Sequence, residues 1–305
     1  MAAQVTTGLT QEMSTYYEKV FLARAEYEYI HAEGAQKRSQ PKNEGKVVNF
    51  TRHTPLATAT TALTEGTNPS EVALTATTVA ATLAEYGTTV KISRFLSLTS
   101  IDSNNKEKIE VVGQNMGETL DEITRNELFT GATVQFAGAK AALTDVAASN
   151  TLSAAEIRKA VRTLKANKAR KYQGRGSYLG KVGPFTSYDL MGDTTWVNSD
   201  TYDNGSEKIY KGELGMLYGV KFLETPNQKT EASTVTVYSN FIHGSDAFGC
   251  IDLEGDKPQL YIIPHTNIDS GNTAGRFSTV AWAAAYVCKT LNANWIINVK
   301  TGATA

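Results

Sequence analysis

Residues whose side chains could support metal or acid–base chemistry are few in this sequence, and their spacing matches no known site. The four histidines are widely separated: His31, His53, His243 and His265. No HExxH motif occurs. The stretch HAE at 31–33 has the His-x-Glu pattern of zinc deaminases, but no PCxxC motif exists to complete such a site. The sequence therefore predicts no metal site.

Two further stretches resemble catalytic signatures only in part. GRGSYLG at 174–180 has the first two glycines of a dinucleotide loop, but Leu179 holds the third position and the stretch precedes a strand. HGSD at 243–246 collects the residue types of a catalytic triad, yet adjacent residues cannot adopt triad geometry. A turn with Ser245 and Asp246 at backbone-capping positions explains it better. We expect no catalytic and no cofactor-binding residues, and predict that the protein is not an enzyme.

The composition is that of a folded, nearly neutral protein. Thirty basic residues against thirty-one acidic ones give a formal charge of -1, which argues against a main task of gripping nucleic acid by its phosphates. Cys250 and Cys288 fit no metal-ligand spacing and lie in apolar stretches, so we expect reduced, buried thiols made in a reducing cytoplasm. Neither a signal peptide nor a run of about 18 apolar residues is found, so no membrane span is expected.

The sequence predicts three main helices. Residues 10–33 are predicted to be helical, with one largely aromatic face: Tyr16, Tyr17, Val20, Phe21, Arg24 and Tyr27. The longest helix is capped by Asp102 or Ser103 and runs to about Gly131. Its apolar positions step by three and four residues: Ile109, Val112, Met116, Leu120 and Ile123. Gly113 and Gly117 lie one turn apart in it, which allows another backbone to approach closely.

A third helix begins with a capping box of Ser153 and Glu156. Its other face and tail are basic: Arg158, Lys159, Arg162, Lys165, Lys168, Arg170, Lys171 and Arg175. A solvated face is the preferred interpretation, and contact with nucleic acid or an acidic neighbour is the alternative. SYLGKVGP, ELGMLYGVKFLET and STVTVYSNFIHG predict short strands, FTSYDLMG a short helix, and Asn204–Gly205 a turn. The C-terminal stretch from Arg276 has strand-like ends around an Ala-rich middle of ambiguous type, and the whole indicates an α+β fold.

Residues 54–89 form an unusual segment in which twelve of thirty-six residues are Thr and eight are Ala. It has no Lys or Arg between Arg52 and Lys91, and too few large apolar side chains to bury a core of its own. The flanking stretches GKVVNF and TTVKISRFL are predicted to be strands. The pattern predicts a long two-stranded arm that needs a neighbour for support.

The order of these elements, with several local strings, resembles the major capsid proteins of tailed bacteriophages with the Hong Kong 97-like fold. The strings are YYEKVFLARAEYEYIH, PKNEGKVVNFTR, LTEG followed by Pro69, EYG at 85–87, GELGMLYGVKFLET and YSNFIHGSDAFG. They look like one podovirus-associated family of such shell proteins, and the resemblance covers about Tyr16 to Val299.

The resemblance implies five segments. They are an N-terminal arm at 1–44, an extension-loop hairpin at 45–94, a peripheral domain with a spine helix at 95–149, an axial domain at 150–265, and a return to the peripheral domain at 266–305. It also implies a function: self-assembly, as hexamers and pentamers, into an icosahedral shell around double-stranded DNA. Assembly in the host bacterial cytoplasm would place the protein in the virion capsid.

The implied partners are further copies of the chain and packaged DNA held without sequence-specific contacts, with separate scaffolding, cement and portal proteins. No cofactor and no membrane contact are implied. Two alternative classes stay open. The first is another self-assembling protein: an encapsulin-like compartment shell, which would share the fold, or another phage structural subunit, although tail-tube proteins are mostly β. The second is a cytoplasmic enzyme with an unrecognised site.

Overall fold

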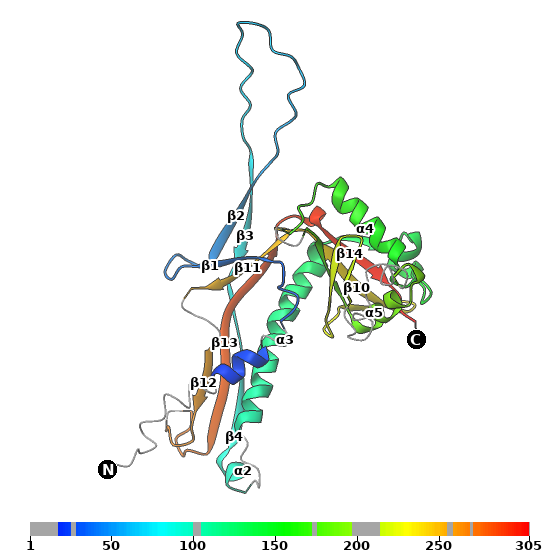
Figure 1. The fold of residues 1–305 in the computed structure, drawn as a ribbon. Helices are drawn as coiled ribbons and strands as arrows, with labels where there is room; N and C mark the ends of the chain where they lie inside the picture. Colours follow the sequence, from blue (N-terminus) through cyan, green and yellow to red (C-terminus); the bar gives the residue numbers. More distant parts are fainter. Residues whose placement is uncertain are drawn as a thin grey trace, which may run out of the picture.

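The computed structural model describes residues 18–25, 29–99, 105–172, 176–196, 214–254, 259–268 and 271–304. Three parts stand out in Figure 1: a long projecting hairpin, an elongated strut in which one long helix lies on a sheet, and a compact domain to one side. We call them the arm, the strut and the compact domain. No helix in the described ranges is long and apolar enough to cross a membrane.

The strut is built around the longest strand, β13 (Phe277–Thr290). β4 (Ala84–Ser93) pairs with one edge of β13, while β11 (Phe248–Leu253) and β12 (Gln259–Ile263) pair with the other. β1 (Gln36–Gln40) adds to β11 in parallel. The Ala-rich stretch of ambiguous type is therefore a strand. Its burial alternates with period two, and five of its side chains face the strut's core: Val280, Trp282, Ala284, Tyr286 and Cys288.

The predicted long helix is confirmed as α3 (Asn105–Gly131), which packs on β13. Ile109, Val112, Met116 and Leu120 are buried, as their spacing predicted. The predicted caps, Asp102 and Ser103, lie outside the described residues. α2 (Arg94–Thr99), a short helix, precedes α3, so Phe95 is helical and not extended as predicted.

The two glycines of α3 admit the N-terminal helical segment, residues 18–25. A Cβ at Gly113 would lie 2.7 Å from the carbonyl oxygen of Phe21, and a Cβ at Gly117 would overlap the backbone of Ala25. The predicted close approach is confirmed. The predicted helix over 10–33 is too long, because residues 29 and 30 are not helical and 31–34 form a turn. Tyr16, Tyr17 and Tyr27 lie outside the described residues.

The compact domain has its own sheet and core. Its strand order is β5 (Thr133–Phe136), β14 (Ile296–Thr301), β10 (Thr236–His243), β6 (Tyr178–Val182), β8 (Val220–Glu224) and β7 (Met216–Leu217), with β9 (Thr230–Ala232) beside β10. α4 (Ala154–Ala166) and α5 (Pro184–Met191) contribute side chains to the core. Short 3-10 turns, η2 (Ala137–Ala139), η3 (Leu143–Asp145) and η4 (Ala293–Trp295), connect these elements.

The capping box predicted for α4 is wrong. Ser153 occupies the N-cap position but makes no side-chain cap hydrogen bond. The Glu156 carboxylate is buried and turned toward β5 and the turn that follows it instead. There it accepts hydrogen bonds from Gln135 Nε2 at 3.0 Å and from the Gly138 N–H at 3.3 Å, and pairs with Lys159 Nζ at 2.7 Å. The remaining basic side chains of α4 that the structure describes are exposed.

The five predicted segments stay a prediction as folding units. Strands from different predicted segments nevertheless share sheets, as two examples show. β11 and β12, from the predicted axial segment 150–265, belong to the sheet of β13. β14, from the predicted return segment 266–305, belongs to the sheet of the compact domain. The turn predicted at Asn204–Gly205 lies outside the described residues.

The arm consists of β2 (Val47–His53), β3 (Ala76–Thr82) and the loop 54–75 between them. β2 pairs with β3, whereas residues 88–93 of the predicted flanking strand TTVKISRFL lie in β4 and pair with β13. A small third core of Phe50, Ala81 and Ile251 anchors the arm on β11. Beyond this core the hairpin projects away from the rest of the chain (Figure 1).

Candidate assembly interface

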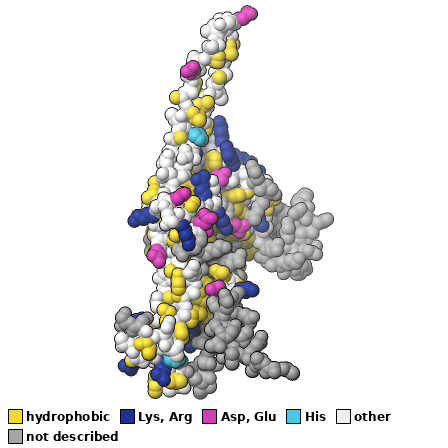
Figure 2. Space-filling view, turned by 90° about the vertical axis from the view of Figure 1, so that its left-hand side faces the viewer, with side chains coloured by type: hydrophobic (Ala, Val, Ile, Leu, Met, Phe, Trp, Pro, Cys, Tyr) yellow, Lys and Arg dark blue, Asp and Glu magenta, His cyan; other side chains and the backbone are white. Residues whose placement is uncertain are grey.

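The arm presents apolar side chains to solvent along its whole length. Every residue from 51 to 78 is exposed. Leu63 and Val72 are each 69% exposed, and Leu56 and Leu74 are more than half exposed. The projecting arm in Figure 2 carries these apolar side chains among small polar ones. Exposed apolar residues gathered on one segment mark an interaction surface. An arm of this kind can bury them only against another molecule.

The arm and the opposite end of the strut differ in charge. Only Glu65 and Glu71 are charged in the loop 54–75, and both are exposed. At the far end of the strut, α2 and its neighbours form a surface that we call the base. It consists of Lys91, Arg94 and Arg276 with three exposed apolar side chains of α2: Phe95, Leu96 and Leu98. Figure 2 shows acidic side chains on the arm and basic ones at the opposite end.

The base also exposes large apolar side chains, although α2 has only six residues. Phe95 is 75% exposed and Leu98 is 71% exposed. α2 is held to the strut through backbone, because the Arg94 N–H donates to the Arg276 carbonyl at 2.7 Å. Exposed aromatic and leucine side chains beside cations are typical of protein–protein contacts.

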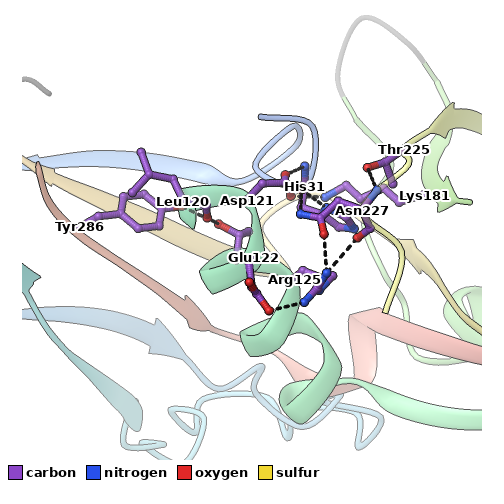
Figure 3. Close-up of polar contacts among 10 residues, drawn as sticks. His31, Leu120, Asp121, Glu122, Arg125, Lys181, Thr225, Asn227 and Tyr286 are labelled. Carbon is purple, nitrogen blue, oxygen red and sulfur yellow. Dashed lines mark hydrogen bonds and ion pairs between the residues drawn. The ribbon is translucent and has the colours of Figure 1, made fainter. Parts of the chain in front are cut away.

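A buried polar junction joins the strut to the compact domain (Figure 3). Asp121 of α3 accepts hydrogen bonds from the His31 N–H at 2.5 Å and from Asn227 Nδ2 at 3.0 Å, and its Oδ2 lies 2.7 Å from His31 Nδ1. Arg125, one turn further along α3, donates to Asn227 Oδ1 at 2.5 Å. Lys181 of β6 donates from Nζ to the His31 carbonyl. His31 is thus held by both parts of the molecule at once.

Burial controls the protonation of this junction. It lowers the pKa of His31 below its ordinary value, against the opposing effect of Asp121. The ring is therefore neutral at neutral pH, and its proton is assigned to Nδ1, because a carboxylate oxygen can only accept. Burial also lowers the pKa of Lys181 to about 8, and the amine lies 4.7 Å from the centre of the Phe248 ring. The junction is a structural contact between the strut and the compact domain.

The other three histidines differ in burial. His243 is fully buried, where desolvation lowers its pKa well below the ordinary value, and its Nδ1 lies 2.9 Å from the Tyr172 hydroxyl. Ser245 donates its N–H to the Arg170 carbonyl, and Asp246 has a φ of 57°, so HGSD forms a turn. His53 is exposed, and His265 is partly exposed at the far end of the strut. Within the described ranges, no three His, Cys, Asp or Glu side chains are grouped to hold a metal ion.

Sequence reasoning missed the junction. HAE at 31–33 was compared only with a zinc motif, and Lys181 appeared as one polar residue in the strand SYLGKVGP. The available signal was a lone lysine in a run of apolar and small residues, since a buried lysine needs a partner. Both cysteines are buried and free, as predicted.

No family model matches the chain, and no curated protein matches it in sequence. Solved structures do match. The capsid of Ralstonia phage GP4 aligns with a TM-score of 0.68 at 15% identity, over 92% of this chain and 91% of that one. The capsid of cyanophage Pam1 aligns with a TM-score of 0.66 at 20% identity, over 93% of each chain. A virus-like particle from Pyrococcus furiosus aligns with a TM-score of 0.55 at 9% identity, over 93% of this chain and 99% of that one.

At these identities the alignments establish the fold. The chain has the Hong Kong 97-like capsid fold, and the α+β class predicted from the sequence is confirmed. The alignments run over nearly the full length of both partners, so they include both the strut and the compact domain.

Proposed function

We propose that this chain is the major capsid protein of a tailed bacteriophage, and that its copies self-assemble into an icosahedral shell around double-stranded DNA. The observation that carries the proposal is the arm, on a fold shared with phage capsids over nine-tenths of the chain. The arm exposes apolar side chains that no other part of the same subunit covers among the described residues. A second subunit is the natural partner, because every copy brings both an arm and a strut.

The partner of the arm is the base of another copy. The arm's Glu65 and Glu71 complement Lys91, Arg94 and Arg276 in charge, and both surfaces offer exposed leucines. Such a contact joins two different surfaces of the same chain, and a head-to-tail contact of this kind generates rings when its rotation closes. Hexamers and pentamers are rings of this type. In this arrangement the strut is the peripheral domain, and the compact domain is the axial domain that meets its copies around the ring axes.

The chain's near-neutral charge supports confinement of DNA without sequence-specific contacts. The exposed basic face of α4 is the part of the described surface best suited to phosphates or to an acidic neighbour. Scaffolding, cement and portal functions are assigned to separate proteins. We assign the chain no catalytic role and place it in the virion capsid, after assembly in the host cytoplasm.

A compartment shell is the second candidate, because the virus-like particle from Pyrococcus furiosus has the same fold over 93% of this chain. The contents of the particles distinguish a phage capsid from a compartment shell. Particles isolated from cells that carry the full set of phage genes should contain nuclease-protected double-stranded DNA. Protein cargo in its place would assign the chain to a compartment.

Assembly itself is tested on the full chain by negative-stain electron microscopy. The key variant changes the four large apolar residues of the arm to serine: Leu56, Leu63, Val72 and Leu74. The matched control changes four arm threonines to serine: Thr58, Thr60, Thr61 and Thr75. We expect closed particles for the wild type and the control, and unassembled but folded subunits for the key variant. Particles from the key variant would refute the role of the arm.

A further inference from the structure

Two cysteines lie directly opposite each other inside the strut. Cys250 of β11 and Cys288 of β13 are partners in the antiparallel register. Both are free and buried, and their sulfur atoms are 3.4 Å apart. Cysteines separated by 37 residues in the sequence are thus neighbours across one strand pair.

The hydrogen-bond pattern defines which kind of strand pair they form. The Leu291 N–H donates to the Ala247 carbonyl at 2.9 Å. In an antiparallel ladder this bond flanks a pair that exchanges no backbone hydrogen bonds, here Phe248 and Thr290. Pair types alternate along the ladder, and Cys250 with Cys288 lies two positions further on, so it is of the same type.

This type of pair has the spacing that a disulfide needs. Its Cα atoms are about 4.5 Å apart, within the range of about 4.4–6.8 Å found across disulfides. The backbone can therefore stay in place while the side chains rotate. Only the two sulfur atoms have to approach, from 3.4 Å to about 2.05 Å.

The surroundings favour ionisation of one thiol. The S–H of Cys288 stabilises the Cys250 thiolate and lowers the pKa of Cys250, despite burial. The Tyr286 and Thr124 hydroxyls and the Lys181 cation act in the same direction. Conversely, the hydrogen bond to Cys250 raises the pKa of Cys288 well above its ordinary value, so that thiol keeps its proton. A thiolate beside a protonated thiol is the arrangement from which a disulfide forms by way of a sulfenic acid.

We propose that Cys250 and Cys288 are an oxidation site, at which a small peroxide converts the pair to a cross-strand disulfide. The Cys250 thiolate attacks one oxygen of hydrogen peroxide and breaks the O–O bond, giving a sulfenic acid and hydroxide. The Cys288 sulfur then attacks the Cys250 sulfur, the S–S bond forms and the S–O bond breaks. Hydroxide takes the Cys288 proton, and the sulfenic oxygen leaves as a second hydroxide that is protonated to water by solvent. Two thiols are oxidised, and one peroxide is reduced to two waters.

The bond would tie β11 to β13 behind α3. Local opening of the strut admits a molecule scarcely larger than water, so burial slows the reaction without blocking it. A reducing cytoplasm keeps the thiols free during synthesis, and oxidising surroundings later close the bond. If the chain is a capsid protein, as proposed above, the bond would form after release from the cell; the oxidation itself does not depend on that proposal.

The test uses the purified full-length chain, treated with hydrogen peroxide or with buffer alone. The protein is then unfolded in a denaturant that contains iodoacetamide, which alkylates free thiols, and no reductant is added. We expect the wild type to lose both alkylatable thiols, to become two hydrogen atoms lighter, and to remain a monomer on a non-reducing gel. Dithiothreitol should restore both thiols, and peptide mapping should link Cys250 to Cys288. The variants Cys288→Ser and Cys250→Ser are the controls, because each lacks the partner thiol and can form no internal bond.

Three results would overturn the proposal. The first is a wild type that keeps both thiols at a peroxide dose that oxidises the single thiol of Cys288→Ser. The second is a wild type that gains oxygen atoms without a linked peptide, or that links only between chains. The third is resistance of all three proteins at any dose that leaves them folded. The mass of the oxidised wild type alone shows whether the disulfide forms. That conclusion therefore does not depend on how well the variants fold.

Discussion

Replacing Lys181 by Met should change how the protein's stability depends on pH. Lys181 is fully buried and its pKa in the folded protein is lowered from 10.5 to about 8, chiefly by desolvation. In the unfolded chain its pKa returns to the ordinary value. At neutral pH the unfolded state therefore binds the proton more tightly. The difference between a pKa of about 8 and one of about 10.5 corresponds to a destabilisation of about 3 kcal/mol at pH values below about 8.

The sign follows from which state binds more protons. Between about pH 8 and about pH 10.5 the folded amine is largely neutral while the unfolded amine is still charged, so wild-type stability rises with pH. About 2 kcal/mol of the destabilisation should disappear between about pH 7 and about pH 9.5. Met has a similar unbranched shape and does not titrate, so the difference between the two proteins cancels the titration of every group that does not interact with Lys181.

The substitution also removes interactions. The His31 carbonyl loses the amine as a donor, which costs about 1–3 kcal/mol, and the contact with the Phe248 ring is worth about 0.5–2 kcal/mol. At neutral pH these losses nearly offset the relief of desolvation, and the variant should be close to the wild type in stability. At about pH 9.5 the variant should be less stable by about 2 kcal/mol, because only the wild type gains.

Urea unfolding of the unassembled subunit, followed by fluorescence at several pH values, measures both curves. The decisive quantity is the wild-type free energy of unfolding minus that of Lys181→Met. A difference that stays constant from about pH 7 to about pH 9.5 would show that Lys181 has an ordinary pKa in the folded protein. The burial argument for the junction would then be refuted.

Three further outcomes are expected. Gly117→Ala should destabilise the subunit by about 1–2 kcal/mol in thermal unfolding, because displacing the helical segment 18–25 at Ala25 outweighs the gain of about 1 kcal/mol in helix propensity; a more stable variant would contradict the contact with Ala25. Asp121→Ala should cost about 3–5 kcal/mol in urea unfolding, since His31 and Asn227 lose their acceptor; a loss below about 1 kcal/mol would show that the junction contributes little. Mature particles boiled in detergent under reducing conditions should give one band near 33.0 kDa, because the arm has no lysine between Lys46 and Lys91 to supply an amine for cross-linking; a ladder mapping to the arm would refute this.

The sequence predicted the elements whose signals are local. The apolar spacing from Ile109 to Leu120 predicted α3, and the glycines at 113 and 117 predicted a close backbone, because both depend on helix geometry alone. Partners distant in the sequence were harder to predict. The strand TTVKISRFL was recognised, but its pairing with β13 depends on residues about 190 positions away that share no local pattern with it.

The polar junction was out of reach for a similar reason. In the sequence Asp121 is one charged residue of a long helix, and only long-range packing brings it to His31, whose carbonyl also accepts a hydrogen bond from Lys181. The cysteine pair shows the same limit. Each thiol was predicted to be buried, but their shared register follows from strand pairing alone.

The junction between arm and strut has a mechanical consequence. Only Leu83 separates β3 from β4, and β4 then pairs with β13 through ten consecutive residues, Ala84 to Ser93. A pull on the arm's tip is therefore carried by one continuous backbone into a ladder that runs along the direction of load. Antiparallel inter-strand bonds lie perpendicular to the strands, so such a force shears all of them together instead of opening them one by one. β13 passes the load to α3 through Trp282 and Tyr286, whose side chains contact Asn115 and Thr124. If the chain forms the proposed shell, outward pressure on linked arms would be borne in tension along the strut and shared among the hydrogen bonds between β4 and β13.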